Sequence, residues 1–332
     1  MRLLVTGGAG FIGSNFVHYW LERHPDDHVV VYDLLTYAGN RPNLAAVEDR
    51  IAFVQGDICD RDLAEQTLRV EEIDVVVNFA AESHNSLAVV DPTRFFRTNV
   101  LGTQTLLDAA RAAGVERFHH VSTCEVYGDL PLDSEEVFHE DSPYRPRTPY
   151  NASKAGADHA VRAYFETFGL PGTITNCSNN YGYYQFPEKV IPLFTTNALD
   201  DKPLPLYAST GNRREWLHVL DHCAAIDLVL REGRAGETYN VGSGLEASIE
   251  EIADLVLELT GKPQSLKTIV PDRPGHDRRY LLDATKIRRE LGWEPSHAWR
   301  EGLAETVAWY AANRQWWEPL RERAPVEETA WR

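Results

Sequence analysis

The sequence has few cysteines, a shortage of basic residues and no long apolar run. Its four cysteines lie far apart without a Cys-x-x-Cys spacing, so neither a disulfide framework nor a zinc site is expected, and a reducing cytoplasm fits best. The 33 basic residues against 50 acidic ones give a formal net charge of −17, which would repel a nucleic-acid backbone or an anionic membrane. No run of 18 apolar residues occurs, and Met1 leads directly into a strand-like segment, so neither a membrane span nor a signal sequence is predicted.

What is present fits a folded chain of about two domains, since 43% of its 332 residues are hydrophobic. An apolar run at residues 2–6 ends in a glycine-rich turn, and residues 14–23 have the pattern of a helix. Glycines in such a turn let the backbone bend sharply and approach a pyrophosphate, whose charge the helix N-terminus stabilises. We therefore expect a dinucleotide to bind at this turn, against Gly7, Gly10, Phe11, Ile12 and Gly13.

The ends of the next two predicted strands carry acidic residues. The strand at residues 29–32 ends in Asp33, about 20 residues after Gly13. A carboxylate at this distance accepts hydrogen bonds from an adenosine ribose and repels a 2′-phosphate, which indicates NAD rather than NADP. The strand at residues 51–55 is followed by Asp57 and Ile58, where Asp57 could reach the adenine amino group. Helix capping is the alternative role for Asp57.

Small residues follow a further strand, which is predicted at residues 74–79 because the apolar character there is unbroken. Ala80, Ala81 and Ser83 come directly after it. Their small side chains would let a cofactor lie flat, and a close contact between a helix and the strand is the alternative. Asp91 and Pro92 then predict the start of a long helix that runs to about residue 113.

Reactive side chains gather after the strand predicted at residues 117–121. Ser122-Thr123-Cys124-Glu125 brings hydroxyl, thiol and carboxylate groups together at the carboxyl end of that strand, where open parallel sheets bind ligands. A helix that begins near Tyr150 places Tyr150 and Lys154 on one face. An ammonium beside a phenol lowers the pKa of the phenol, so Tyr150 is expected to act as a base near neutral pH.

Together these motifs resemble the extended short-chain dehydrogenase/reductase superfamily, through Gly7-x-x-Gly10-x-x-Gly13, Thr123 and Tyr150-x-x-x-Lys154. Within it the chain is similar to the nucleoside-diphosphate-sugar 4,6-dehydratases, the dTDP-glucose 4,6-dehydratases in particular. That similarity extends to about residue 320 and rests on residues 35–40, 80–84, 176–182, 186–189, 214–216 and 273–277. The resemblance implies an α/β fold, with a Rossmann-type doubly wound parallel sheet and a smaller C-terminal substrate-binding domain.

The resemblance also implies a reaction. Bound NAD takes hydride from carbon 4 of the sugar, water is eliminated across carbons 5 and 6, and the hydride returns to carbon 6. Thr123, Tyr150 and Lys154 match the oxidation machinery of the family, and Glu125 stands where the family has the base that removes the carbon 5 proton. The implied substrate contacts are Ser83, Thr123, Asn179, Asn180, Glu188, Lys189, Arg214, Asn240, Arg273 and His276.

Three departures from the family pattern lie near the expected sugar site. Cys124 replaces the aspartic acid that protonates the departing hydroxyl, and a thiol is a poorer acid than a carboxylic acid. Residues 85–88 read Asn-Ser-Leu-Ala instead of Val-Asp-Arg-Ser, and Tyr183 replaces proline. The favoured interpretation is a dehydratase that converts dTDP-glucose to the 4-keto-6-deoxy sugar. The alternatives are a 5,6-dehydratase that leaves an exocyclic alkene, a UDP-glucuronate decarboxylase or 4-epimerase, and a nucleotide-sugar-binding protein without catalysis.

The predicted domains are interleaved along the chain. Residues 1–175, with a return at 215–240, are expected to form the NAD-binding domain. The nucleotide-sugar-binding domain is expected from residues 176–214 and 241–320, followed by a charged tail at 321–332. The only expected partners are a nucleoside-diphosphate sugar and a second copy of the chain, paired through the helices near 92–113 and 150–168. No metal, nucleic acid or membrane is expected to bind.

Overall fold

A seven-stranded parallel sheet forms the centre of the computed structural model, which describes residues 1–272 and 274–323. Its strands are β1 (Arg2–Thr6), β2 (His28–Asp33), β3 (Ile51–Gln55), β4 (Val75–Asn78), β5 (Arg117–Thr123), β6 (Gly172–Cys177) and β10 (Thr238–Val241). They lie in the order β10-β6-β5-β4-β1-β2-β3, which confirms the predicted Rossmann-type doubly wound sheet. The strand order reverses between β1 and β4, and folds of this kind bind ligands in the crevice at that point.

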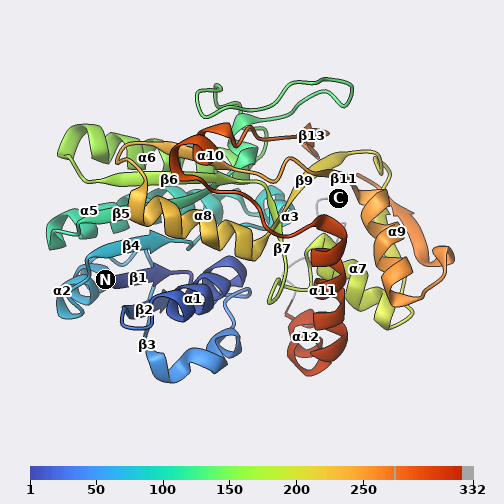
Figure 1. Ribbon diagram of the computed structural model, residues 1–332, viewed down its shortest axis with the longest axis horizontal. Coiled ribbons are helices and arrows are strands. Elements are labelled where there is room, and N and C mark those ends of the chain that lie inside the picture. The colour runs from blue at the N-terminus through green and yellow to red at the C-terminus, as the bar shows by residue number, and fades with distance from the viewer. Residues whose placement is uncertain (273, 324–332) are drawn as a thin grey trace.

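Helices cover both faces of this sheet because successive strand residues point to opposite sides. One face carries α1 (Phe11–Arg23), the 3-10 helix η1 (Arg41–Arg50) and α8 (Val219–Glu232), and the other carries α2 (Arg61–Val70), α5 (Thr103–Ala113) and α6 (Pro149–Phe168). Leu3 and Val5 of β1 pack with Phe16 of α1, whereas Leu4 between them packs with Leu107 of α5. Figure 1 shows α1 and α8 in front of the sheet, with α5 and α6 beyond its strands.

The helix predicted from residue 92 is present, but its backbone is not uniform. Asp91 caps α4 (Pro92–Phe95), as the sequence indicated, and α3 (Asn85–Val90) precedes it. The π-helix η2 (Phe96–Gly102) then links α4 to α5. Within η2, the Asn99 amide donates to the Glu82 carbonyl and to Ser153 Oγ. This wider turn therefore ties the segment after β4 to α6, in keeping with the frequent location of π-helical turns at functional sites.

A second group of elements lies beside the large sheet, at the right of Figure 1. Strands β7 (Asn179–Tyr181), β9 (Arg213–His218), β11 (Glu246–Ser248) and β13 (Arg279–Tyr280) form one small sheet, and β8 (Leu204–Tyr207) pairs with β12 (Lys267–Val270). The helices of this group are α7 (Val190–Leu199), α9 (Ile249–Thr260), α11 (Trp299–Ala312) and α12 (Arg314–Arg321). Phe194 of α7, Trp216 of β9 and Ile252 of α9 share its apolar core. A capping box of Ser248 and Glu251 begins α9.

The segment predicted to return to the first domain is divided between the two sheets. Its helix α8 and strand β10 belong with the large sheet, whereas β9 belongs to the small sheet. The 3-10 helices η3 (Cys124–Tyr127) and η4 (Gln264–Leu266) and helix α10 (Thr285–Leu291) complete the elements. Residues 324–332 of the predicted tail lie outside the described residues, while Arg321 at its start pairs with Asp200.

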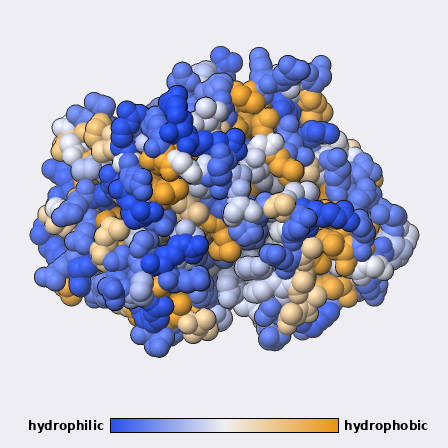
Figure 2. All heavy atoms as spheres, in the orientation of Figure 1, coloured by the Kyte–Doolittle hydropathy of each residue, from blue (hydrophilic) through white to orange (hydrophobic). Residues whose placement is uncertain are grey.

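The face of the molecule in Figure 2 is mostly hydrophilic, with apolar side chains in scattered patches. Across residues 1–272 and 274–323, none of the helices has both the length and the apolar character needed to cross a membrane.

Candidate active site

A cavity of about 520 Å³ follows the carboxyl ends of the central strands and extends between the two sheets. The glycine-rich turn and the ends of β2 to β6 line one side of it, and residues of β7, β9 and β13 line another. The predicted site residues that line it are Gly7, Gly10, Phe11, Ile12, Gly13, Asp33, Asp57, Ile58, Ala80, Ala81, Ser83, Thr123, Glu125, Tyr150, Lys154, Asn179, Asn180, Glu188, Lys189, Arg214 and His276. The structure thus gathers residues that are far apart in sequence around one space.

The glycine-rich turn brings the start of α1 against the end of β4. Gly7 has φ +66°, and a Cβ there would lie 2.7 Å from the Ala80 backbone nitrogen. A Cβ on Gly13 would collide with the Gly7 carbonyl, so neither position has room for a side chain. The first turn of α1 borders the cavity, and such turns carry N–H groups without partners inside the helix. This cradle of backbone donors fits a pyrophosphate.

Asp33 is fixed at the end of β2 by two backbone donors. Its Oδ2 accepts from Ala9 N at 2.9 Å and its Oδ1 accepts from Leu35 N at 2.7 Å. Burial raises the pKa of this carboxyl, and both N–H groups act against that shift. Its position at the cavity beside the glycine turn fits the expected contact with an adenosine ribose.

Asp57 borders the same cavity, but its carboxylate binds two residues that do not line the cavity. Its Oδ1 accepts from Cys59 N at 2.9 Å, and its Oδ2 pairs with Arg97 at 3.1 Å. The residue that caps α2 is Asp60, whose side chain accepts from Leu63 N. The capping alternative for Asp57 is therefore wrong.

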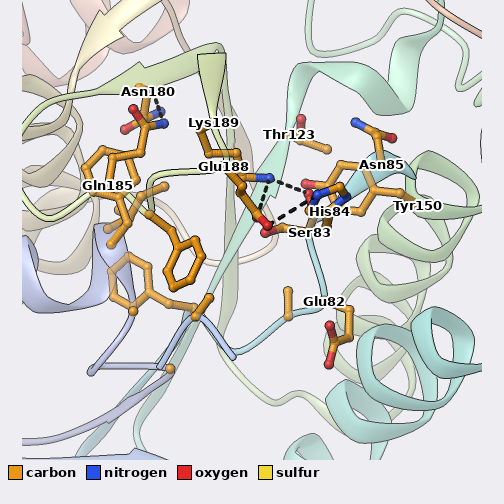
Figure 3. A pocket seen from close by; sticks show the side chains of 18 of the residues that line it. Glu82, Ser83, His84, Asn85, Thr123, Tyr150, Asn180, Gln185, Glu188 and Lys189 are labelled. Carbon is orange, nitrogen blue, oxygen red and sulfur yellow. Dashed lines mark hydrogen bonds and ion pairs between the residues drawn. The ribbon is translucent and has the colours of Figure 1, made fainter. Parts of the chain in front are cut away.

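Three reactive side chains meet at the end of β5. Glu125 follows β5 in η3, is only 9% exposed, and accepts a hydrogen bond from Asn85 Nδ2 through Oε2 at 3.3 Å. Thr123 Oγ1 accepts from Glu125 N at 3.3 Å and lies on the same wall. Tyr150 packs against Phe95 with its ring edge to face. Figure 3 shows Thr123, Asn85 and Tyr150 on one side of the pocket.

Lys154 is held at the end of β5. Lys154 Nζ donates to the Val121 carbonyl at 2.7 Å and lies 3.2 Å from His120 Nε2. Burial lowers the pKa of Lys154 to about 8, while Asp158 acts in the opposite direction. Burial, reinforced by the charge of Glu125, raises the pKa of Tyr150 well above its ordinary value. Burial therefore acts against the phenolate form of Tyr150, and the help expected from Lys154 stays a prediction.

The far end of the cavity holds a buried cluster around Glu188. Its Oε1 accepts from the Tyr37 hydroxyl at 2.8 Å, and its Oε2 lies 3.2 Å from His84 Nε2. Lys189 Nζ donates to the Ser83 carbonyl at 3.1 Å, so the cluster bridges the two sheets (Figure 3). Burial raises the pKa of Glu188. Sequence reasoning did not single out Tyr37, although it lies in one of the segments that carry the family resemblance.

Polar residues of the small sheet line the wall between these two ends. Arg214 is held by backbone carbonyls, among them that of Arg278 at 3.1 Å, and its guanidinium lies 4.8 Å from the centre of the Tyr280 ring. Tyr280 in turn donates to Asn179 Oδ1 at 2.8 Å. Asn180 Oδ1 lies 2.9 Å from His222 Nδ1, and burial lowers the pKa of that histidine to about 3. A neutral His222 therefore orients the Asn180 amide.

Two predicted site residues do not reach the cavity. Cys124 is fully buried in an apolar cluster with Val126 and Leu130, because the turn into η3 directs it to the core while its neighbours on both sides line the cavity. Burial raises the pKa of its thiol well above the ordinary value. Asn240 is also fully buried, accepting from the Tyr127 hydroxyl at 2.9 Å and donating to the Phe138 carbonyl at 3.0 Å. Its amide is used to anchor a loop.

Of the other two departures from the family pattern, one lies at the cavity and the other does not. Asn85 and Ser86 line the cavity, as expected for residues that could face a sugar. Tyr183 packs against Trp309 with ring centres 5.9 Å apart, and its carbonyl accepts from Asn15, away from the cavity lining. Arg273 lies outside the described residues. Within the part of the chain that the structure describes, no group of three or more His, Cys, Asp or Glu side chains is placed to hold a metal ion.

Comparison with known proteins gives consistent results. The family model described as GDP-mannose 4,6 dehydratase matches residues 4–306. The dTDP-glucose 4,6-dehydratase of Streptomyces niveus is 50% identical over 335 residues, which cover 99% of this chain and 98% of that protein. The crystal structure of DesIV, a dTDP-glucose 4,6-dehydratase from Streptomyces venezuelae solved with NAD bound, has a TM-score of 0.93 at 53% identity, covering 96% of this chain and 100% of that one. UDP-glucose 4-epimerase from Thermotoga maritima has a TM-score of 0.88 at 29% identity, covering 95% and 100%.

Proposed function

Since this chain belongs to the GDP-mannose 4,6 dehydratase family, we propose that it converts dTDP-glucose to the 4-keto-6-deoxy sugar with NAD as cofactor. The observation that carries this proposal is the placement of Tyr150, Thr123 and Glu125 in one cavity with the glycine turn and Asp33. The cavity therefore combines residues for oxidation, a carboxylate base and a binding turn for a dinucleotide, so all three could act on one bound substrate. The relatives that match nearly the whole chain at about half identity are named as dTDP-glucose 4,6-dehydratases, which favours this substrate over UDP sugars.

NAD, when bound, would supply a hydride acceptor for carbon 4, a positive charge, and the hydride that carbon 6 receives at the end. The glycine turn and the start of α1 would hold its pyrophosphate, and Asp33 its adenosine ribose. Tyr150 removes the proton of the 4-hydroxyl. Burial raises the pKa of Tyr150, so a positive charge nearby would favour its action as a base.

Glu125 carries out the second step. A ketone at carbon 4 acidifies the proton on carbon 5, and the Glu125 carboxylate lines the cavity where it can remove that proton. The hydrogen bond from Asn85 fixes one of its oxygens and leaves the other for the substrate. At the nucleotide end, Arg214 suits the diphosphate by its paired donors, and Glu188 with Lys189 suits the base.

A substrate deuterated at carbon 4 tests this proposal. We expect the deuterium on carbon 6 of a 4-keto-6-deoxy product, because the same hydride leaves carbon 4 and returns to carbon 6. Proton and deuterium NMR of the product identify the labelled carbon. Deuterium retained on carbon 4 beside an exocyclic alkene would establish the 5,6-dehydratase instead. If incubation with the protein changes the mass of neither dTDP-glucose, UDP-glucose nor UDP-glucuronate, the chain would be a nucleotide-sugar-binding protein without catalysis.

We also propose that the chain forms a homodimer and acts in the cytoplasm. The helices expected to pair expose Phe96 (44%), Leu101 (53%) and Phe168 (50%), apolar surface that pairing with a second copy would cover. Light scattering at micromolar concentration is expected to give about twice the 37.5 kDa of one chain. Replacing Leu101 and Phe168 with glutamate should then shift the mass toward that of one chain, and a monomeric parent protein would refute the dimer.

A further inference from the structure

The elimination step needs a proton donor that position 124 does not provide. Hydroxide is a poor leaving group, so its departure from carbon 6 requires an acid within hydrogen-bonding distance. Cys124 lies in the apolar cluster outside the cavity. Burial also makes its thiol a still weaker acid than a free cysteine. If the chain is a dehydratase, another group must give this proton.

Asp277 is a buried carboxyl group on the cavity wall that the steps above do not use. It lies just before β13, is 1% exposed, and lines the same cavity as Glu125. Its Oδ2 accepts from Asn151 Nδ2 at 3.4 Å. Its Oδ1 is buried and has no hydrogen-bond partner among the described residues, with Arg147 Nη1 3.6 Å away. A buried carboxyl oxygen without a hydrogen-bond partner is unusual, and a ligand group in the cavity would supply one.

A line of hydrogen bonds joins Asp277 to Glu125 through the first turn of α6. Asn151, which donates to Asp277, also donates its backbone N–H to Thr148 Oγ1 at 3.2 Å, and Thr148 is the N-cap of α6. Thr148 Oγ1 donates to Asn85 Oδ1 at 3.3 Å, and Asn85 donates to Glu125. The two carboxyl groups are therefore held in a fixed relation on either side of the helix start that carries Tyr150.

Burial is the main reason why Asp277 can keep a proton. Burial and then the like charge of Glu125 raise the pKa of Asp277 to about 7, Arg214 and Arg147 act to lower it, and Asp129 raises it further. A buried carboxyl group that can carry a proton near neutral pH, in one cavity with a second carboxyl group, suits acid and base catalysis on a single substrate.

We propose that Asp277 is the general acid that protonates the departing 6-hydroxyl, in place of a residue at position 124. The inference rests on the proposed function. Glu125 takes the proton from carbon 5, and the electron pair of that bond forms the double bond between carbons 5 and 6. The bond from carbon 6 to oxygen breaks, and its electron pair takes the Asp277 proton to give water. Asp277 is left as a carboxylate, which regains a proton from solvent before the next turnover.

The test compares two leaving groups in Asp277→Asn, whose amide keeps the size of the side chain but cannot give a proton. The single-turnover rate of elimination from dTDP-glucose is expected to fall by about 100-fold or more, which is the usual contribution of a general acid to a rate. Elimination of fluoride from dTDP-6-deoxy-6-fluoroglucose should stay near the wild-type rate, because fluoride leaves without full protonation. NADH formation from both substrates should persist. Equal losses on the two substrates would overturn the role of Asp277.

Asp221→Asn is the matched control. Asp221 is also buried, at 3% exposure, and accepts from Ser296 and His297 at a site away from the cavity. Any effect of this variant should be the same for both substrates. If Asp221→Asn also slows elimination from dTDP-glucose but not fluoride elimination, general loss of structure produces the difference. The assignment of Asp277 would then fail.

The wild-type pH profile gives a second test that needs no variant. Elimination from dTDP-glucose should slow as the pH rises through about 7, where Asp277 loses its proton, and fluoride elimination should not. The charged and titratable groups around Asp277 are Glu125, Arg147, Arg214, Asp129 and Tyr280. The same decline for both leaving groups would contradict the role. A wild-type protein that leaves dTDP-glucose unchanged would instead refute the proposed function itself.

Discussion

Glu125→Gln is expected to lower the rate of dTDP-glucose dehydration by about 10²- to 10⁴-fold while leaving oxidation at carbon 4 intact. Glutamine matches the size of glutamate and can still contact Asn85, but it cannot accept the carbon 5 proton. NADH absorbance should therefore appear after substrate is added and then persist, because the next step is blocked. In deuterated water, NMR should show no entry of deuterium at carbon 5.

Glu215→Gln is the matched control for this variant. Glu215 is fully buried, its carboxylate accepts from Gly244 N at 2.7 Å and Leu282 N at 3.0 Å, and it lies outside the cavity lining. Its substitution should affect the free energy of unfolding without abolishing deuterium exchange. Exchange at the wild-type rate in Glu125→Gln would assign the base to another residue.

Tyr150→Phe is expected to stop the reaction one step earlier. Without the phenolic oxygen, the site loses the group assigned to take the proton of the 4-hydroxyl, so hydride transfer should slow by about 10²- to 10⁴-fold. No NADH absorbance should appear after dTDP-glucose is added, although calorimetry should still detect its binding through the distant nucleotide contacts. The contrast with Glu125→Gln, which accumulates NADH, separates the oxidation from the elimination.

Tyr127→Phe controls for the loss of a buried hydroxyl. The Tyr127 hydroxyl donates to Asn240 at 2.9 Å and accepts from Asn176 at 2.8 Å, and Tyr127 does not line the cavity. Its removal should cost about 1 to 3 kcal/mol of unfolding free energy, because two amides lose a partner. NADH should still form. If Tyr150→Phe also forms NADH at the wild-type rate, the base is a different group.

Most of the large sheet could be predicted from the sequence because its signals are local. The unbroken apolar runs of β1, β2 and β4 indicate buried parallel strands by themselves, and the glycine turn follows β1 directly. The π-helical turn at η2 gave no such signal. The sequence predicts one continuous helix there, and the π-helical backbone goes with contacts of Asn99 to residues from other segments.

In the candidate site, too, the features that depend on local sequence could be predicted and those that depend on distant contacts could not. Motif residues such as Asp33 and Glu125 reach the cavity, because a strand end fixes where they emerge. The motif does not determine the direction of each side chain within a tight turn. Cys124 therefore points to the core, although Thr123 and Glu125 on either side of it line the cavity. The link between Asp277 and Glu125 passes through side chains of two further segments, and only the fold brings these together.

The capping threonine of α6 has a consequence for how the enzyme loses activity. Thr148 closes the first turn of the helix and also holds Asn85, so the helix end and the two carboxyl groups belong to one cooperative unit. Helix termini open more readily than cores, at a free energy well below that of global unfolding. Opening of this one turn would release Asn85 and Asn151 together and misalign both carboxyl groups while the sheet stays folded. Inactivation by heat or denaturant should thus precede unfolding, as a local event at the start of α6.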